Sequence, residues 1–410
     1  MNHRGISQFL TSEKFKRFDY NENSKERGNQ LFQATSGFTT ENSPSGINYC
    51  GHIYNSIIPD AFSDLETKAI SAWEKPGTVK ITDLPDDFKL SDYNFDDIPF
   101  FSLGESMTDY LTGTVAVIPT GNSWNLSFHR FQKKSADTAV VRIVDRHLNA
   151  VLNESSDKIP VSFITGASPE IALGASISLK TPGGELEFAA SLKNDDIHLI
   201  KSDEWFFPED CELVFCGYLE KNCLLPEGPF VDITATSDFI RNQPRFSLKH
   251  IYSRPHPVIP HILPSGPEHG YLMGEPRRLH IISGLKKSEF NVHDISLTRG
   301  GSHWLYAVIS LDYTEKTDEL SELVFSLHPS LKKVTFVNTD INVNSSEQVE
   351  WAESTRCQPH RDIIVFNDQL GSSLDPSSQN GQTSKWSVNT LVKDIKNSEK
   401  YRRQLPFLKV

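Results

Sequence analysis

Residues 113–118 read GTVAVI and residues 138–144 read TAVVRIV. Both runs are rich in β-branched residues, which is typical of β-strands. Strand-like runs of the same kind recur downstream, at 159–165, 212–219, 231–235 and 246–253. Because few helices separate these strands, the middle of the chain is predicted to form a barrel or another β-rich α+β domain.

Two helices are predicted among these strands. One covers 145–152 and begins at Asp145, because aspartate is suited to the N-cap position. The other begins at Ser168, which is followed by Pro169 in the first turn.

The last third of the chain has a different pattern. Strands and helices alternate there in the order 304–311 (strand), 318–328 (helix), 333–337 (strand), 345–356 (helix) and 363–366 (strand). This β-α-β-α-β order predicts a small parallel sheet with right-handed crossovers. The Ser-, Gln- and Gly-rich segment 371–385 is predicted to be a loop.

Composition limits the classes of protein to which the chain can belong. Its 410 residues are enough for two or three domains, and its formal net charge of −12 argues against a broad nucleic-acid-binding face. No run of about 18 apolar residues predicts a membrane span, and residues 1–20 lack the apolar core of a signal peptide. The cysteines are odd in number and irregularly spaced, so we expect them to be reduced, in keeping with a cytoplasmic location. They are Cys50, Cys211, Cys216, Cys223 and Cys357.

The segment 264–276, PSGPEHGYLMGEP, places an acid beside an imidazole. Its glycines and prolines predict a loop, and loops commonly carry catalytic groups. Glu268 could give or take a proton if burial raised its pKa, with His269 orienting it. The alternative is that Glu268 is an exposed loop acid and that His269 points to solvent.

Asn125, His147 and Glu227 form a candidate metal site. An amide oxygen, an imidazole nitrogen and a carboxylate oxygen suit Mn²⁺ or Mg²⁺ better than zinc, because no thiolate is offered. Their spacing is weak evidence, since 22 residues separate the first two and 80 separate the last two. The alternative is a surface asparagine, a histidine at a helix start and a glutamate in a turn.

Arg130 follows Asn125 by five residues, in the segment NLSFHR. Its planar guanidinium could hold a substrate carboxylate through two parallel hydrogen bonds. The alternative is an ordinary salt bridge to one of the many acids in the chain.

Eight segments, in this order over roughly residues 110–390, together resemble the UbiD family of prenylated-flavin-dependent decarboxylases. The first four are NLSFHR (125–130), RHL (146–148), PVSFITGASPEIALGASISL (160–179) and LPEGPFVDITAT (225–236). The other four are HILPSGPEHGYLMGEP (261–276), LTRGGSHWLYAVIS (297–310), VEWAESTRCQPHRDIIVF (349–366) and GSSLDPSS (371–378).

The resemblance implies an α+β fold in three parts. These are an N-terminal α/β segment (1–100), a central split β-barrel that binds prenylated FMN (101–297) and a C-terminal α/β oligomerisation domain (298–410). The strand-rich middle and the alternating C-terminal third agree with this division.

The resemblance also implies roles for particular residues. Asn125, His147 and Glu227 would bind a divalent metal, usually Mn²⁺, that holds the flavin phosphate, with K⁺ nearby. Arg130 would hold the substrate carboxylate beside the flavin, and Glu268 would deliver a proton to the carbon that loses CO₂. Four further residues are expected to contact the cofactor: Ser127, Phe128, His129 and Arg146.

One departure from the family pattern concerns the acids around this arginine. Many members carry a second glutamate five residues before the acid that Glu268 matches, and here that position is Leu263. A three-residue Glu–Arg–Glu network is therefore in doubt at this position.

The length and the wording of the motifs resemble the short archaeal-type branch of the family. The function expected from it is decarboxylation of an α,β-unsaturated acid such as trans-anhydromevalonate 5-phosphate of isoprenoid synthesis. The alternatives are an aromatic or polyprenyl-hydroxybenzoate acid as substrate, a catalytically silent flavin-binding subunit of a carboxylase complex, and an unrelated β-barrel that binds anions. A flavin prenyltransferase is the expected supplier of cofactor, and a homo-oligomer is expected through the C-terminal domain.

Overall fold

The computed structural model of the chain describes residues 5–11, 13–177 and 184–402. The chain forms two compact units, Met1–Leu272 and Met273–Val410, and the division falls within helix α7 (Pro267–Leu285). The second unit therefore begins earlier in the sequence than residue 298, where the last domain was expected to start. No helix in these described ranges is long and apolar enough to cross a membrane.

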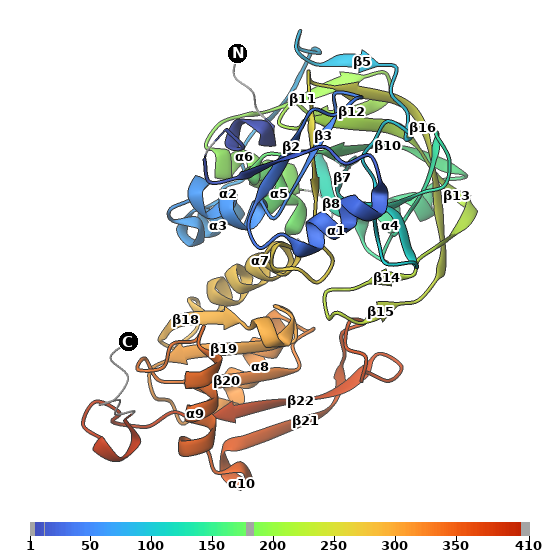
Figure 1. Cartoon of the computed structure of the whole chain (residues 1–410). Helices are drawn as coiled ribbons and strands as arrows, with labels where there is room; N and C mark the ends of the chain where they lie inside the picture. The colour runs from blue at the N-terminus through green and yellow to red at the C-terminus, as the bar shows by residue number, and fades with distance from the viewer. Residues whose placement is uncertain (1–4, 12, 178–183, 403–410) are drawn as a thin grey trace. The chain divides into compact units, whose positions relative to one another are not determined.

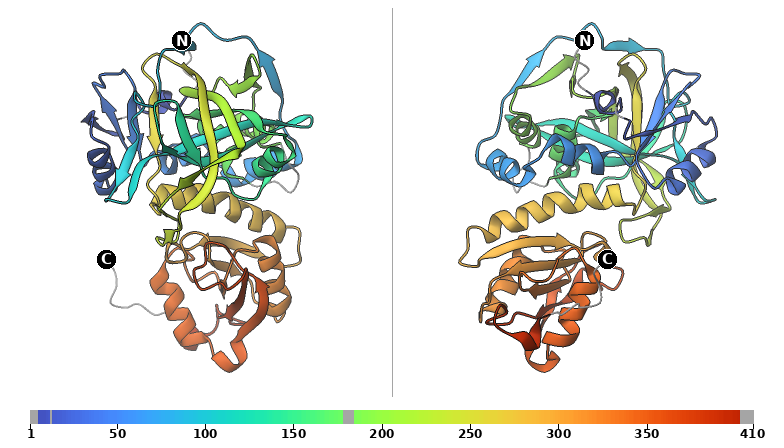
Figure 2. Two further views of the ribbon diagram at one scale, coloured as in Figure 1. Left: turned by 90° about the vertical axis from the view of Figure 1, so that its right-hand side faces the viewer. Right: turned by 60° about the vertical axis from the view of Figure 1, so that its left-hand side comes forward.

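Six strands of the first unit close into a ring, in the order β10-β13-β16-β9-β8-β7 and back to β10. All neighbouring pairs in the ring are antiparallel. Figure 1 shows several of these strands around one centre, and the long β13 and β16 curve across the left view of Figure 2. The strands are β7 (Met107–Thr120), β8 (Ser123–Lys133), β9 (Thr138–Val141), β10 (Lys158–Thr165), β13 (Leu213–Glu227) and β16 (Arg241–Ser253). The strand-rich middle predicted from β-branched composition is thus confirmed.

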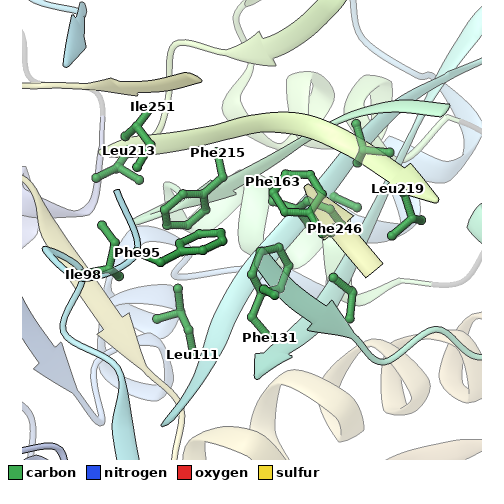
Figure 3. Packing of buried hydrophobic residues seen from close by; sticks show 14 of the residues in the cluster. Phe95, Ile98, Leu111, Phe131, Phe163, Leu213, Phe215, Leu219, Phe246 and Ile251 are labelled. Atoms are coloured by element: carbon green, nitrogen blue, oxygen red, sulfur yellow. The ribbon is translucent and has the colours of Figure 1, made fainter. Parts of the chain in front are cut away.

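A cluster of phenylalanine rings fills the inside of this ring. Phe131 and Phe163 lie 4.6 Å apart between ring centroids, and Phe246 lies 5.1 Å from Phe163 and 5.4 Å from Phe131. Phe95 and Phe215 complete the group at 5.5 Å from each other (Figure 3). All five rings are fully buried, so the strands of the ring share one tightly packed core.

Two helices pack against β8 from the other side of the sheet. They are α5 (Pro169–Ser176) and α6 (Glu185–Lys193), and their apolar residues share a core with Leu126 of β8. The predicted start of α5 is confirmed, because the Ser168 side chain accepts a hydrogen bond from the Ile171 N–H. Helix α4 (His147–Glu154) starts two residues later than Asp145, which was predicted to be its N-cap.

Strands of the first hundred residues share their sheets with segments that follow later in the chain. For example, β3 (Asn48–Gly51) pairs with β17 (Val258–His261), and β4 (Val79–Thr82) pairs with β11 (Ile197–Ser202). The other strands of the unit are β1 (Lys16–Asp19), β2 (Phe38–Glu41), β5 (Lys89–Ser91), β6 (Phe101–Leu103), β12 (Trp205–Pro208), β14 (Phe230–Val231) and β15 (Ser237–Asp238). Its other helices are α1 (Ser24–Gln33), α2 (Tyr54–Ala61) and α3 (Leu65–Glu74). All five cysteines are free, and all except Cys223 are buried.

The second unit contains a five-stranded sheet in the order β18-β19-β20-β22-β21. Its strands are β18 (Val292–Leu297), β19 (Tyr306–Leu311), β20 (Lys333–Val337), β21 (Ile363–Leu370) and β22 (Gln382–Asn389), and its helices after α7 are α8 (Thr317–Leu327), α9 (Ser346–Arg356) and α10 (Pro359–Asp362).

The prediction of a small parallel sheet is only partly correct. β19, β20 and β22 are parallel, but β18 and β21 are antiparallel edge strands. β22 was missed because the polar segment 371–385 was predicted to be a loop, although the strand already begins at Gln382. The third predicted strand therefore lies at the edge, with β22 between it and β20.

Removing one ring of the core should destabilise the first unit. We expect Phe246→Ala to lower the free energy of unfolding by about 3–5 kcal/mol, because a cavity replaces contacts with three other rings. Urea denaturation followed by circular dichroism measures this loss. Phe32→Ala is the control, since that ring is 71% exposed and its removal should change the free energy by less than about 0.5 kcal/mol. Equal losses in the two variants would contradict the core assignment.

Candidate active site

Strand β8 carries most of the residues that the sequence singled out. Asn125 and Arg130 lie five positions apart on it, which corresponds to roughly 16 Å at the usual rise of a strand. An odd separation also places their side chains on opposite faces of the strand. A ligand that reaches both residues must therefore be elongated.

Three side chains meet at the Asn125 end of β8. His147 Nδ1 lies 3.4 Å from the Asn125 amide nitrogen and 3.8 Å from Glu185 Oε1. Asn125 Oδ1 and Glu185 Oε2 are buried without a hydrogen-bond partner. Buried polar oxygens without partners are rare, and these two belong to the side chains that flank the His147 imidazole, so the three side chains could hold a cation.

The electrostatics of these groups agree with that interpretation. Burial raises the pKa of Glu185 to about 7. Burial, followed by the nearby Arg146, lowers the pKa of His147, which keeps the imidazole neutral and able to bind a metal. No group of three His, Cys, Asp or Glu side chains suited to a metal occurs within the described ranges, so this set depends on the Asn125 amide.

Glu227 was predicted to be the third ligand of this set, and the structure places it elsewhere. Its Oε1 accepts hydrogen bonds from Arg130 Nε at 2.8 Å and from the Tyr110 hydroxyl at 2.9 Å, and its Oε2 accepts from Arg130 Nη2 at 3.0 Å. Both oxygens are thus committed to the other end of β8. Glu227 therefore does not lie with Asn125 and His147, as the sequence predicted, and the acid beside His147 is Glu185.

Close packing of α5 on α6 brings Glu185 to the site. A Cβ at Gly174 of α5 would lie 2.7 Å from the Glu185 carbonyl oxygen, so only glycine allows this approach. In the sequence Glu185 resembles any acid in the first turn of a helix, a favourable place for negative charge. The only sequence signal is the pair of glycines before it, which predicts a tight turn but no ligand.

Arg130 lies at the centre of the other cluster of the site. Besides its two bonds to Glu227, its Nη2 donates to Asp238 Oδ2 at 2.8 Å. The ring of Phe230 lies 3.8 Å from its guanidinium carbon, a cation–π contact. Burial by itself lowers the pKa of Arg130, but the bonds to Glu227 and Asp238 outweigh burial and the net shift is upward. The guanidinium is therefore charged, oriented and mostly screened from water.

The cluster also resolves the departure at Leu263. That residue packs against the core that contains Tyr110 and Phe230. The second carboxylate of Arg130 is Asp238, which approaches from the β14–β15 hairpin. Arg130 therefore still bonds two acids, Glu227 and Asp238, although position 263 is a leucine.

The remaining predicted cofactor residues lie along or next to β8. His129 Nδ1 lies 2.9 Å from the Arg142 carbonyl oxygen, so it carries the proton, and Nε2 accepts from the Ser127 hydroxyl at 2.9 Å. Burial lowers the pKa of His129 to about 4, so the ring is neutral and orients Ser127. Phe128 is half-buried on the opposite face, and Arg146 immediately precedes α4.

The loop predicted at 264–276 is wrong, since helix α7 begins at Pro267. Glu268 lies in its first turn and is fully buried. Its Oε1 accepts hydrogen bonds from the backbone N–H groups of Ile53 and Tyr54, both at 2.7 Å, at the start of α2. Burial raises the pKa of Glu268. This contact gives Glu268 a structural task, which differs from the proton delivery that the family resemblance implies.

His269 is near the Arg130 cluster. Its Nδ1 accepts the Ser265 N–H at 3.1 Å, so the proton of the neutral ring is on Nε2. Burial lowers its pKa to about 4, and the two charged groups that act on it are Asp232 and Arg130. Asp232, which the sequence did not single out, is therefore a half-buried acid near His269.

Two family models match the chain. The model of the UbiD 3-octaprenyl-4-hydroxybenzoate carboxy-lyase Rift-related domain matches residues 88–267, and the model of the C-terminal domain of the same carboxy-lyase matches residues 270–390. Anhydromevalonate phosphate decarboxylase of Methanocaldococcus jannaschii is 34% identical over 318 residues, which is 75% of this chain and 74% of the relative. Phenolic acid decarboxylase of Bacillus subtilis is 25% identical over 304 residues, which is 69% of this chain and 64% of the relative.

Solved structures share the fold at lower identity. The UbiD-class enzyme HmfF from Pelotomaculum thermopropionicum, solved in complex with FMN, has a TM-score of 0.89 at 22% identity, covering 98% of this chain and 97% of that chain. The apo 3,4-dihydroxybenzoic acid decarboxylase from Enterobacter cloacae has a TM-score of 0.85 at 15% identity, covering 99% and 96%.

Two substitutions of Glu268 separate its structural task from a catalytic one. Glu268→Ala leaves two N–H groups at the start of α2 unpaired. We therefore expect the free energy of unfolding to fall by about 1–3 kcal/mol for each unpaired N–H group. In Glu268→Gln the amide oxygen accepts the same bonds, so the loss should be smaller and turnover should persist. Thermal unfolding and an activity assay measure both. A well-folded Glu268→Gln protein without turnover would instead show that Glu268 is the proton donor.

Proposed function

The chain belongs to the UbiD family, whose members are carboxy-lyases, and we propose that it decarboxylates a small α,β-unsaturated acid with the help of prenylated FMN. We further propose that this acid carries a phosphate group, as trans-anhydromevalonate 5-phosphate does. Five curated relatives at 28–34% identity, all archaeal, are anhydromevalonate phosphate decarboxylases. The observation that carries the proposal is the oriented guanidinium of Arg130 between Glu227 and Asp238.

The cofactor end of the site is assigned to the residues around His147. Asn125, His147 and Glu185 offer two oxygens and one nitrogen, a donor set that fits Mn²⁺ or Mg²⁺. A cation there would hold the cofactor phosphate, and the two unpaired buried oxygens support this assignment. A second, monovalent cation such as K⁺ stays a prediction.

The substrate end is assigned to Arg130. Glu227 holds the guanidinium from one side through both of its oxygens, and Tyr110 in turn holds Glu227. A substrate carboxylate bound to the remaining N–H groups of Arg130 would be aligned for loss of CO₂. Low exposure around Arg130 keeps water out and strengthens these interactions.

Loss of CO₂ leaves an electron pair on an sp² carbon, and prenylated FMN, when bound, supplies the electron sink for that pair. The protein then has to place a proton on that carbon. We assign this step to Asp232, because both oxygens of Glu227 are committed to other groups and Glu268 is bonded to α2. His269, with its proton on Nε2, would orient Asp232.

The remaining expectations follow from the family and stay predictions. They are a central split barrel as the flavin-binding domain, a homo-oligomer formed through the C-terminal domain, a cytoplasmic location and a flavin prenyltransferase as the source of cofactor.

Replacing Arg130 tests the proposed function. The protein is co-expressed with a flavin prenyltransferase, and CO₂ release from trans-anhydromevalonate 5-phosphate is measured. We expect turnover by the wild type and a fall of at least about 100-fold in kcat/KM for Arg130→Lys, because an ammonium cannot bond Glu227 bidentately and hold a carboxylate as well. Flavin content should stay near that of the wild type. No CO₂ release from a flavin-loaded wild type with this or other unsaturated acids would refute the proposal.

A matched pair of variants tests the proposed roles of the two glutamates. We expect Glu185→Gln to lose most of its Mn²⁺ and flavin, because a neutral amide binds a divalent cation more weakly than a carboxylate does. Glu227→Gln should keep both but lose turnover, because it weakens the hold on Arg130. Metal analysis by mass spectrometry and the flavin absorbance spectrum give the readouts. The reverse pattern would restore Glu227 as the metal ligand.

A further inference from the structure

Arg130 is one of three arginines that converge on a single aspartate. Asp238 Oδ2 accepts from Arg130 Nη2 at 2.8 Å, Asp238 Oδ1 accepts from Arg241 Nη1, and Arg142 Nε lies 3.9 Å from Asp238 Oδ2. With Glu227 included, three guanidinium groups face two carboxylates. The guanidinium groups therefore outnumber the two carboxylates that hold them.

Strand register makes this arrangement costly for the protein alone. The β8–β9 ladder pairs Phe131 with Val141, so the next pair along it is Arg130 with Arg142, and the Arg142 N–H bonds the Arg130 carbonyl at 3.2 Å. Directly opposite residues share one face of the sheet, and like charges in such a pair are destabilising. Burial, and then repulsion from Arg241 and Arg130, lowers the pKa of Arg142. The pairing of Arg130 with Arg142 therefore places more cationic N–H groups at this point than the nearby carboxylates bond.

Most of these N–H groups are available to a ligand. Arg142 Nη1 donates to the Ile143 carbonyl at 2.7 Å, and Arg241 Nη1 donates to Asp238. The other N–H groups of the two side chains donate to no group in the part of the chain that the structure describes. Their side chains are 21% and 36% exposed, so both can be reached from solvent.

We propose that Arg142 and Arg241 form an anion subsite beside Arg130 that binds the phosphate group of the substrate. This inference rests on the proposed function, because it assigns the second anionic group of the same substrate. Two guanidinium forks match a phosphate dianion, and Arg130 is left for the carboxylate. The phosphate of the cofactor has a separate place at Asn125 and His147, roughly 16 Å away along β8 by strand rise.

The test uses holoenzyme made with a flavin prenyltransferase, and two substrates that differ only in the phosphate group. These are trans-anhydromevalonate 5-phosphate and the dephosphorylated acid. We expect Arg142→Gln and Arg241→Gln each to lower the ratio of kcat/KM for the phosphorylated acid to that for the dephosphorylated acid by at least about tenfold. Arg241→Lys, which keeps the charge, should recover part of the ratio.

Arg245→Gln is the matched control. Arg245 lies on the same strand as Arg241 with a side chain that is 37% exposed, but it is paired with Glu220 outside the cluster. Its replacement should leave the ratio unchanged. An unchanged ratio in both cluster variants would overturn the proposal, and so would a loss of flavin, because the arginines would then hold the cofactor.

Inorganic phosphate serves as a probe that does not need turnover. Isothermal titration should show that phosphate binds the wild-type holoenzyme and the Arg245→Gln control, and that binding weakens at least about tenfold in the cluster variants. If the wild type decarboxylates neither acid, the proposed function fails and this titration still decides the subsite. If the wild type prefers the dephosphorylated acid, the subsite fails and the decarboxylase function stands.

Discussion

The pairing of β10 with β7 closes six strands into a ring, and the positions of the site residues depend on that closure. β10 then has a partner on each side, β7 and β13, so the ring has no free edge at which its strands could slip or separate. The aromatic core inside holds the strands at fixed spacing. β8 is thereby held rigidly, with the proposed cation site near Asn125 at one end and the proposed carboxylate site at Arg130 toward the other.

Burying Arg130 has a large desolvation cost, which its partners offset. Removing one partner of such a pair typically costs about 3–5 kcal/mol, because it leaves a charge unpaired away from water. Glu227 comes from β13 and Asp238 from the β14–β15 hairpin, so the pairing also ties separate segments to β8. The same desolvation that makes the pairing costly also strengthens the attraction between Arg130 and a bound anion, because the charge of the guanidinium is weakly screened there.

Residue composition predicted most of the strands. It failed to predict α7, which contains prolines, and β22, which begins with polar residues. Glycines and prolines predict a loop where α7 begins. Pro267 nevertheless occupies the first turn of the helix, where a missing N–H costs nothing, and Pro276 lies inside the helix. Strand β22 was missed because its first residues are polar and follow a Ser- and Gly-rich segment. Both errors arose because tertiary packing can outweigh the local preferences that composition indicates.

The sequence by itself determined the β-rich middle, the alternating C-terminal third and the family, and it singled out Asn125, His147 and Arg130 as candidate site residues. Only the tertiary structure decided which acid serves which partner. The sequence does not distinguish the three glutamates. In the structure Glu185 lies beside His147, Glu227 is bonded to Arg130, and Glu268 accepts hydrogen bonds at the start of α2. The reason is physical: a carboxylate takes its role from the groups within hydrogen-bond reach, and those are set by strand register and helix packing between residues distant in sequence.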